Sequence, residues 1–114
     1  MTVINLINVS TITPTTVAGA VTTSRASIID VAADKVAKVN TLMISNIDGT
    51  NAADITVEVS VDNGSNYVAI AKTVSVPADA TLVVVGKDNG FYLDETDILA
   101  VTASAASDLT YLCS

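Results

Sequence analysis

The sequence contains no histidine and no tryptophan, and its one cysteine, Cys113, is the penultimate residue. Without histidine there can be no Ser-His-Asp triad, no Cys-His nucleophile and no histidine metal ligand. A single cysteine cannot form an internal disulfide. Cys113 has no basic neighbour in sequence to stabilise a thiolate, which favours a small packed hydrophobic side chain. We therefore expect neither an enzyme nor a bound cofactor.

Positive charge is also scarce in this chain. Five basic side chains stand against twelve acidic ones, so the net charge is −7, and the basic residues are not clustered. Nucleic acids and anionic membrane surfaces are therefore unfavourable partners. The longest unbroken run of Leu, Ile and Val is Leu82-Val83-Val84-Val85, whereas a membrane-spanning helix needs ~20 apolar residues. We expect neither nucleic acid nor a membrane as a partner.

Strand-forming residues dominate the composition. Val, Ile and Thr number 17, 10 and 15 among 114 residues, whereas Glu and Lys number two and four. β-Branched side chains favour strands, and the length fits one domain with a two-layer core. The four aromatic residues are too few to build that core, so it must be aliphatic. Tyr67, Phe91 and Tyr92 either cap the ends of the core or form a contact patch for carbohydrate or protein.

Strand patterns recur along the chain with turn signals every eight to twelve residues. The clearest is 54–61, where Ile55, Val57, Val59 and Val61 alternate with polar residues and are predicted to face inward. The cluster 62–65 that follows is typical of a hairpin turn. The segment 81–86 is apolar on both faces and predicts a central, covered strand. Further strands are predicted over 25–31, 36–47, 67–72, 73–76, 91–93, 98–104 and 109–113.

These patterns predict an all-β fold, namely an antiparallel β-sandwich of jelly-roll or immunoglobulin-like type. One local alternative stays open, because a short helix over 31–38 competes with a turn at 32–35. Pro77 is expected to mark the end of a strand, since proline cannot donate to a β-ladder.

The N-terminal segment 2–24 contains no charged side chain. We divide the chain into an extended N-terminal arm, residues 1–24, and a β-sandwich domain, residues 25–114. The arm either packs on its own domain, pairs with the sheet of a neighbouring subunit, or stays free in solvent. Arg25 is either an ordinary exposed side chain or the partner of a neighbour's carboxylate. The candidate interface residues are Val3, Ile4, Leu6, Ile7, Val9, Ile12 and Arg25.

Two acidic segments are candidates for ion binding. Asp94, Glu95 and Asp97 offer oxygen ligands for a cation, or a pair of carboxylates for acid–base chemistry. The other interpretation, which we favour, is a solvated turn whose carboxylates bind their own backbone. The segment 62–66 partly imitates a calcium loop but lacks its ligand spacing, because Thr73 stands where glutamate is needed.

Several short motifs follow one another in order between residues 42 and 104. They are Leu42-Met43-Ile44-Ser45-Asn46, Thr56-Val57-Glu58-Val59, Tyr67 leading into Ile70-Ala71-Lys72, Val76-Pro77-Ala78, Thr81-Leu82-Val83, and Leu93 to Ser104. In this order they resemble a family of small β-sandwich virion proteins encoded by tailed bacteriophages. Members of that family usually carry glycine where Thr96 stands in this sequence.

The resemblance implies a non-enzymatic structural protein located in the virion. It implies capsid decoration, or else a neck, tail or fibre-attachment component, and partners such as major capsid or neck and tail proteins. Because exposed sheet edges must be paired or covered, we expect a homo-oligomer, either a trimer or a ring. A carbohydrate- or protein-binding β-sandwich module is the alternative from another class.

Overall fold

The computed structural model describes residues 14–114, which form ten strands and one 3-10 helix, η2 (Lys87–Asn89). The predicted all-β class is confirmed, and the alternative of a helix over 31–38 is wrong. The strands are β1 (Val17–Ala20), β2 (Ala26–Asp30), β3 (Ala37–Val39), β4 (Leu42–Asn46), β5 (Ala53–Ser60), β6 (Val68–Val76), β7 (Thr81–Val85), β8 (Phe91–Leu93), β9 (Ile98–Ala103) and β10 (Leu109–Cys113).

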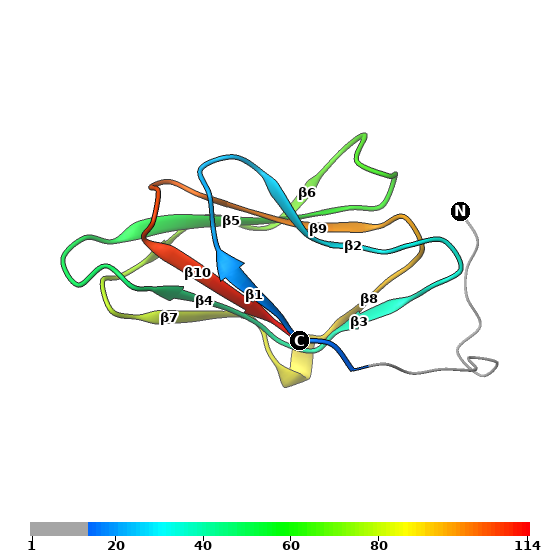
Figure 1. The fold of residues 1–114 in the computed structure, drawn as a ribbon, viewed down its shortest axis with the longest axis horizontal. Coiled ribbons are helices and arrows are strands. Elements are labelled where there is room, and N and C mark those ends of the chain that lie inside the picture. The colour runs from blue at the N-terminus through cyan, green and yellow to red at the C-terminus, as the bar shows by residue number, and fades with distance from the viewer. Residues whose placement is uncertain (1–13) are drawn as a thin grey trace.

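Two four-stranded antiparallel sheets lie face to face (Figure 1). The first, sheet A, has the order β1-β10-β4-β7, and the second, sheet B, has the order β2-β9-β5-β6. Strands β3 and β8 form a separate two-stranded antiparallel sheet near one end of these two layers. This antiparallel two-layer arrangement agrees with the predicted β-sandwich.

The core between the sheets is aliphatic, as the scarcity of aromatic residues predicts. Alternate residues of each strand point inward, so both layers supply branched side chains to the same interior. Phe91 and Tyr111 are only partly buried and pack against this core. The largest fully buried side chains are Leu42, Ile44, Ile55, Leu93, Leu99, Leu109, Val21, Val39, Val57, Val76, Val101 and Cys113.

Two predicted strand boundaries are wrong. The single strand expected over 36–47 is divided into β3 and β4 at Asn40 and Thr41, whose N–H groups both donate to the carbonyl of Ser114 at 2.9 and 3.1 Å. The chain thereby leaves the small sheet and enters sheet A. The two segments expected over 67–76 are instead one strand, β6, in which Thr73 has a φ of 47° and interrupts the regular pairing.

The position of a strand within its sheet was also predicted wrongly. The segment 81–86 does not form a central strand, because β7 lies at an edge of sheet A. The covered strand is β9, in the middle of sheet B, where the outward Ala100 is as fully buried as the inward Leu99. Val61 is 60% exposed rather than inward, since β5 ends at Ser60 and the chain then enters the hairpin turn.

Three of the edge strands carry β-bulges. The register of β2 shifts between Ser27 and Ile29, that of β6 shifts twice, and that of β7 shifts beside Leu42 and Met43 of β4. A bulge twists an edge and disturbs its ladder of backbone groups, which hinders pairing with another chain. Strand β1, by contrast, pairs regularly with β10. These three edges are therefore poor templates for strand addition.

The predicted domain boundary at residue 24 falls inside the folded domain. Strand β1 pairs with β10 of the same chain, and the Val21 that follows it is only 1% exposed. The Val21 N–H donates to the Leu109 carbonyl at 2.9 Å, and the Thr22 carbonyl accepts from Ala103 at 2.8 Å. This part of the predicted arm therefore packs on its own domain. The candidate interface residues Val3, Ile4, Leu6, Ile7, Val9 and Ile12 lie outside the described residues.

Candidate functional site

The acidic segment at 94–97 forms a tight turn in which carboxylates accept from backbone groups. Asp97 Oδ2 accepts from the Asp94 N–H at 3.0 Å, and Glu95 Oε2 accepts from the Asp34 N–H at 2.8 Å. Asp97 and Glu95 are 3% and 8% exposed, and Asp97 Oδ1 is buried without a hydrogen-bond partner. Within residues 14–114, no three acidic or cysteine side chains gather in a way that could hold a metal ion. The carboxylates bind backbone groups, as the favoured interpretation predicts, but the prediction of a solvated turn is wrong, because Glu95 and Asp97 are buried and Glu95 accepts from the distant Asp34.

Thr96 occupies the strained position of this turn. Its φ is 66°, in the left-handed region that a β-branched residue rarely adopts, and its N–H donates to the Val31 carbonyl at 2.8 Å. Glycine adopts this conformation without a steric cost.

We expect Thr96→Gly to raise the free energy of unfolding by about 1 kcal/mol, because the relief of strain exceeds the extra chain entropy of glycine. Urea denaturation followed by circular dichroism measures this change. Thr102→Gly in the ordinary extended backbone of β9 is the matched control, and it should be destabilising. A loss of stability in Thr96→Gly would contradict the assignment of strain.

The hairpin turn between β5 and β6 is organised by Asp62. Its Oδ1 accepts from Ser60 Oγ and from the Asn66 N–H, both at 2.9 Å, and its Oδ2 accepts from Asn66 Nδ2 at 2.9 Å. Asn63 and Gly64 have φ values of 59° and 88°, which is the two-residue pattern that an Asn-Gly hairpin favours. The carboxylate oxygens therefore serve the turn, as the preferred interpretation of 62–66 predicts.

The hydrogen bonds of this turn predict a loss of stability in acid. The side-chain and backbone bonds from Asn66 lower the pKa of Asp62 below its ordinary value of 3.8. A carboxyl group with a lowered pKa contributes stability above its unfolded pKa, and that contribution disappears as the pH falls through the folded pKa. We therefore expect a melting temperature that is steady above pH 4 and falls below it.

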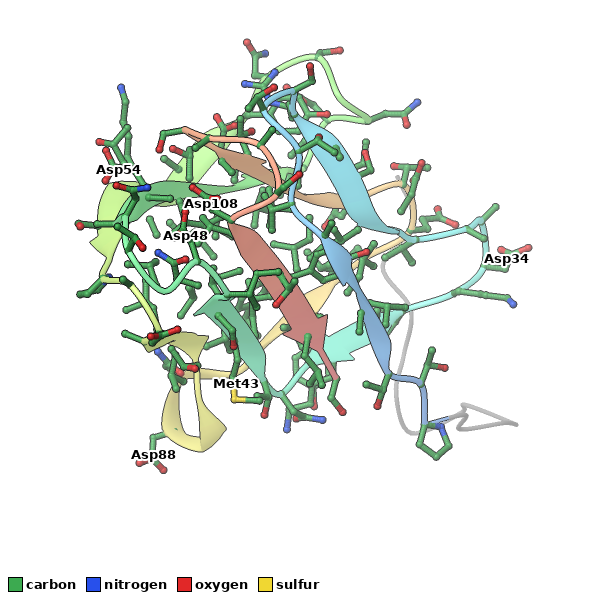
Figure 2. The ribbon with its side chains drawn as sticks, turned by 60° about the vertical axis from the view of Figure 1, so that its left-hand side comes forward. Asp34, Met43, Asp48, Asp54, Asp88 and Asp108 are labelled. Carbon is green, nitrogen blue, oxygen red and sulfur yellow. The ribbon has the colours of Figure 1, made fainter. Side chains whose placement is uncertain are left out.

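Asp62→Asn isolates this contribution in the same experiment. The variant should melt at a lower temperature than the natural chain at pH 7 and should show a shallower decline below pH 4. Asp48 and Asp108, which lie near each other in Figure 2, are present in both proteins. Burial, followed by the charge of Asp48, raises the pKa of Asp108, so its own effect has the opposite sign. Parallel melting curves for the two proteins across the acid range would contradict the role of Asp62.

Arg25 has its carboxylate partner within the same chain. Its Nε and Nη2 donate to Oε1 and Oε2 of Glu58 at 3.0 and 3.2 Å. The guanidinium group also stacks over the ring of Tyr67, 4.0 Å from the ring centroid. The hydrogen bond to Glu58 raises the pKa of Arg25 above its usual value. This group connects the start of β2 to β5 and the β5–β6 hairpin across the outer face of sheet B.

The aromatic residues do not form one continuous patch. Tyr67 lies under Arg25, Phe91 packs against the core, and Tyr92 is 53% exposed. Lys38 places its Nζ 5.5 Å from the Tyr92 ring centroid. The core-capping interpretation therefore describes Phe91, whereas Tyr92 belongs to a surface.

That surface is an apolar groove between β8 and the β5–β6 hairpin, with a volume of about 340 Å³. Four of its side chains are 45–66% exposed, and they form the densest cluster of exposed apolar side chains on the described part of the chain. These four are Val61, Val68, Ile70 and Tyr92. Sequence reasoning missed the groove because Val61 was expected inside. The residues that line it are Val59, Val61, Val68, Ile70, Phe91, Tyr92, Leu93 and Asp97.

Cys113 is buried in β10, as predicted for a packed hydrophobic side chain. Burial raises the pKa of its thiol, so little thiolate is present at neutral pH. The side chain is accordingly a structural part of the core.

No helix within residues 14–114 is long and apolar enough to cross a membrane. Comparison of the chain with protein-family models, with curated proteins and with solved structures found no match. The function must therefore be argued from the topology and surfaces of the chain itself.

Proposed function

We propose that this chain is a non-enzymatic structural protein of a virion, which self-associates and binds other particle proteins as a capsid decoration protein. We also propose that the sandwich is of jelly-roll type. Jelly rolls are eight-stranded double sheets, and they recur in viral capsid and lectin domains. A fold alone does not fix a function, so the proposal also draws on the surface of this chain.

The pairing of the strands is the observation that carries the jelly-roll proposal. When the small β3–β8 sheet is set aside, eight strands remain. The first pairs with the last (β1 with β10), the second with the seventh (β2 with β9), the third with the sixth (β4 with β7), and the fourth with the fifth (β5 with β6). A long hairpin wrapped into two sheets gives these partners, whereas the first strand of an immunoglobulin-like sandwich pairs with the second.

The exposed apolar groove supports a role in assembly. Val61, Val68, Ile70 and Tyr92 project from this small domain into solvent. Exposed apolar patches with polar rims mark interaction surfaces. The bulged edges of β2, β6 and β7 hinder open-ended pairing of strands between copies, which suits an assembly built from side-chain contacts.

Mass spectrometry and electron cryo-microscopy of virus particles from cells that carry the gene test this proposal. The protein is expected in purified particles at a fixed copy number, with density for two facing sheets on the outside of the shell. Particles that lack the protein, while it accumulates free in the same lysate, would contradict the proposal. Density at the neck or tail would instead place the protein there.

The lectin-like alternative has one specific feature in its favour, the exposed Tyr92 ring beside the groove. A ring of this kind can stack on a sugar, but Lys38 lies over Tyr92 in this structure. A glycan-array screen of the purified chain, with Tyr92→Ala as the control, tests this alternative. Binding that disappears in Tyr92→Ala would favour it.

A further inference from the structure

The outer face of sheet A carries no charged side chain. Eight residues point outward from its four strands, while their neighbours in sequence point into the core. The outer face of sheet B is different, because Asp30, Asp54 and Glu58 lie on it. In Figure 2, Asp34 lies in a loop at one end, Asp48 and Asp108 lie at the other, and Met43 lies on β4. The eight outward residues are Ala18, Ala20, Met43, Ser45, Thr81, Val83, Thr110 and Leu112.

The strand register divides this face into two rows. In the apolar row, Ala18 is paired with Leu112, Leu112 with Met43, and Met43 with Val83. The second row consists of Ala20, Thr110, Ser45 and Thr81 and is small or hydroxylated. A shallow depression of about 480 Å³ lies over β1, β10 and β4 and includes part of both rows. The apolar row therefore crosses the whole width of the sheet.

We propose that this face joins two copies of the chain through a two-fold axis that runs parallel to the strands, between β10 and β4. This inference rests on the self-association in the proposed function and replaces the expected trimer or ring with a pair. The symmetry places Ala18 opposite the partner's Val83 and Leu112 opposite the partner's Met43. The smallest side chain of the row thus faces a larger one, which suits sheets that pack ~10 Å apart.

The charge of the molecule favours a second copy as the occupant. Each chain has a net charge of −7, so two copies repel each other. They can approach most closely where neither has a charged side chain, and this face meets that condition on both sides of a two-fold axis. A charged partner would instead select complementary charges on the surface that it contacts, and this face has none.

The size of the face sets the strength of the contact. Four strands spaced ~4.8 Å apart and four to five residues long cover roughly 300 Å² in each copy. A stable interface uses about 800 Å² per partner, so the contact is weak and its formation depends on concentration.

A pair of glutamate substitutions tests the proposal in the full chain. Val83→Glu puts a negative charge on the outer face of sheet A, and Ser75→Glu is the control on β6 of sheet B, where Ser75 is paired with Asp54 and lies outside the apolar groove. Val83 and Ser75 are both exposed and lie on edge strands. Analytical ultracentrifugation from about 10 µM to 1 mM covers the micromolar to millimolar range of a weak dimer. Circular dichroism verifies that each variant is folded, and Leu112→Glu substitutes for Val83→Glu if that variant unfolds.

We expect the natural chain and Ser75→Glu to approach a mass of about 23 kDa, twice the 11.6 kDa of the chain, as concentration rises. Val83→Glu is expected to stay monomeric throughout. Association of Val83→Glu as strong as that of the natural chain, or dissociation by Ser75→Glu instead, overturns this inference and leaves the proposed self-association intact. A trimeric mass overturns the two-fold axis. A natural chain that is monomeric at 1 mM overturns the inference, and absence from purified particles is the separate result that overturns the proposed function.

Discussion

Deletion of residues 1–24 is expected to lower the free energy of unfolding by at least ~3 kcal/mol more than deletion of residues 1–13 does. The longer deletion removes all of β1 and uncovers the edge of β10. It also removes Val21, which is 1% exposed and whose burial alone is worth ~1.5–3 kcal/mol. Domains of this size have only ~5–15 kcal/mol of stability in total. The shorter deletion keeps every described strand.

Urea denaturation of the full chain and both deletions, followed by circular dichroism, measures this difference. Each protein must be compared at the same low concentration, because association stabilises the folded state. Equal stability of the two deletions would mean that β1 and Val21 contribute nothing to the domain. A truncation designed to test the role of an N-terminal arm should therefore end at residue 13.

Ile55→Ala is expected to destabilise the protein by about 3–4 kcal/mol, within the range for a buried Ile-to-Ala change. Ile55 is fully buried in β5, between Ala103 of β9 and Val74 of β6, and its removal leaves a cavity between two sheets that cannot collapse to fill it. The melting temperature should fall by more than ~10 °C, since each kcal/mol corresponds to several degrees in a small domain.

Ile47→Ala is the control, because the same atoms are deleted from a side chain that is 62% exposed. Surface substitutions of this kind usually change stability by less than ~0.5 kcal/mol. Thermal denaturation of the two variants side by side separates the effect of burial from the loss of the same atoms at an exposed site. Similar losses in both variants would contradict the position of Ile55 in the core.

The parts of the fold that could be predicted are those specified by local patterns. The alternation of apolar and polar residues located β5, and the Asn-Gly pair located the hairpin turn that follows it. The position of β7 could not be predicted in this way. Its apolar residues on both faces suggested a central strand, but Val84 lies at a bulge and Val83 points outward into the apolar row of sheet A.

The candidate surfaces depend on contacts between distant segments, which sequence patterns do not specify. The groove forms because β8 lies beside the start of β6, and nothing near Val68 in sequence indicates that Tyr92 is its neighbour. A bidentate pair between Arg25 and a carboxylate of a neighbouring subunit was one of the two predicted possibilities. The carboxylate partner is instead Glu58 of the same chain. In the acidic turn, the bond between Asp94 and Asp97 is local and could be predicted, whereas the bond from Asp34 to Glu95 and the burial of both carboxylates depend on distant segments.

The pairing of β1 with β10 has a consequence for biosynthesis. Sheet A cannot close until the last strand has left the ribosome, because β10 lies between β1 and β4. Contacts between residues so far apart in sequence make folding slow. The emerging chain must keep its unpaired strands apart while translation finishes. Slowing elongation near the codons of β10 should therefore increase aggregation, whereas slowing it near the codons of β1 should have little effect.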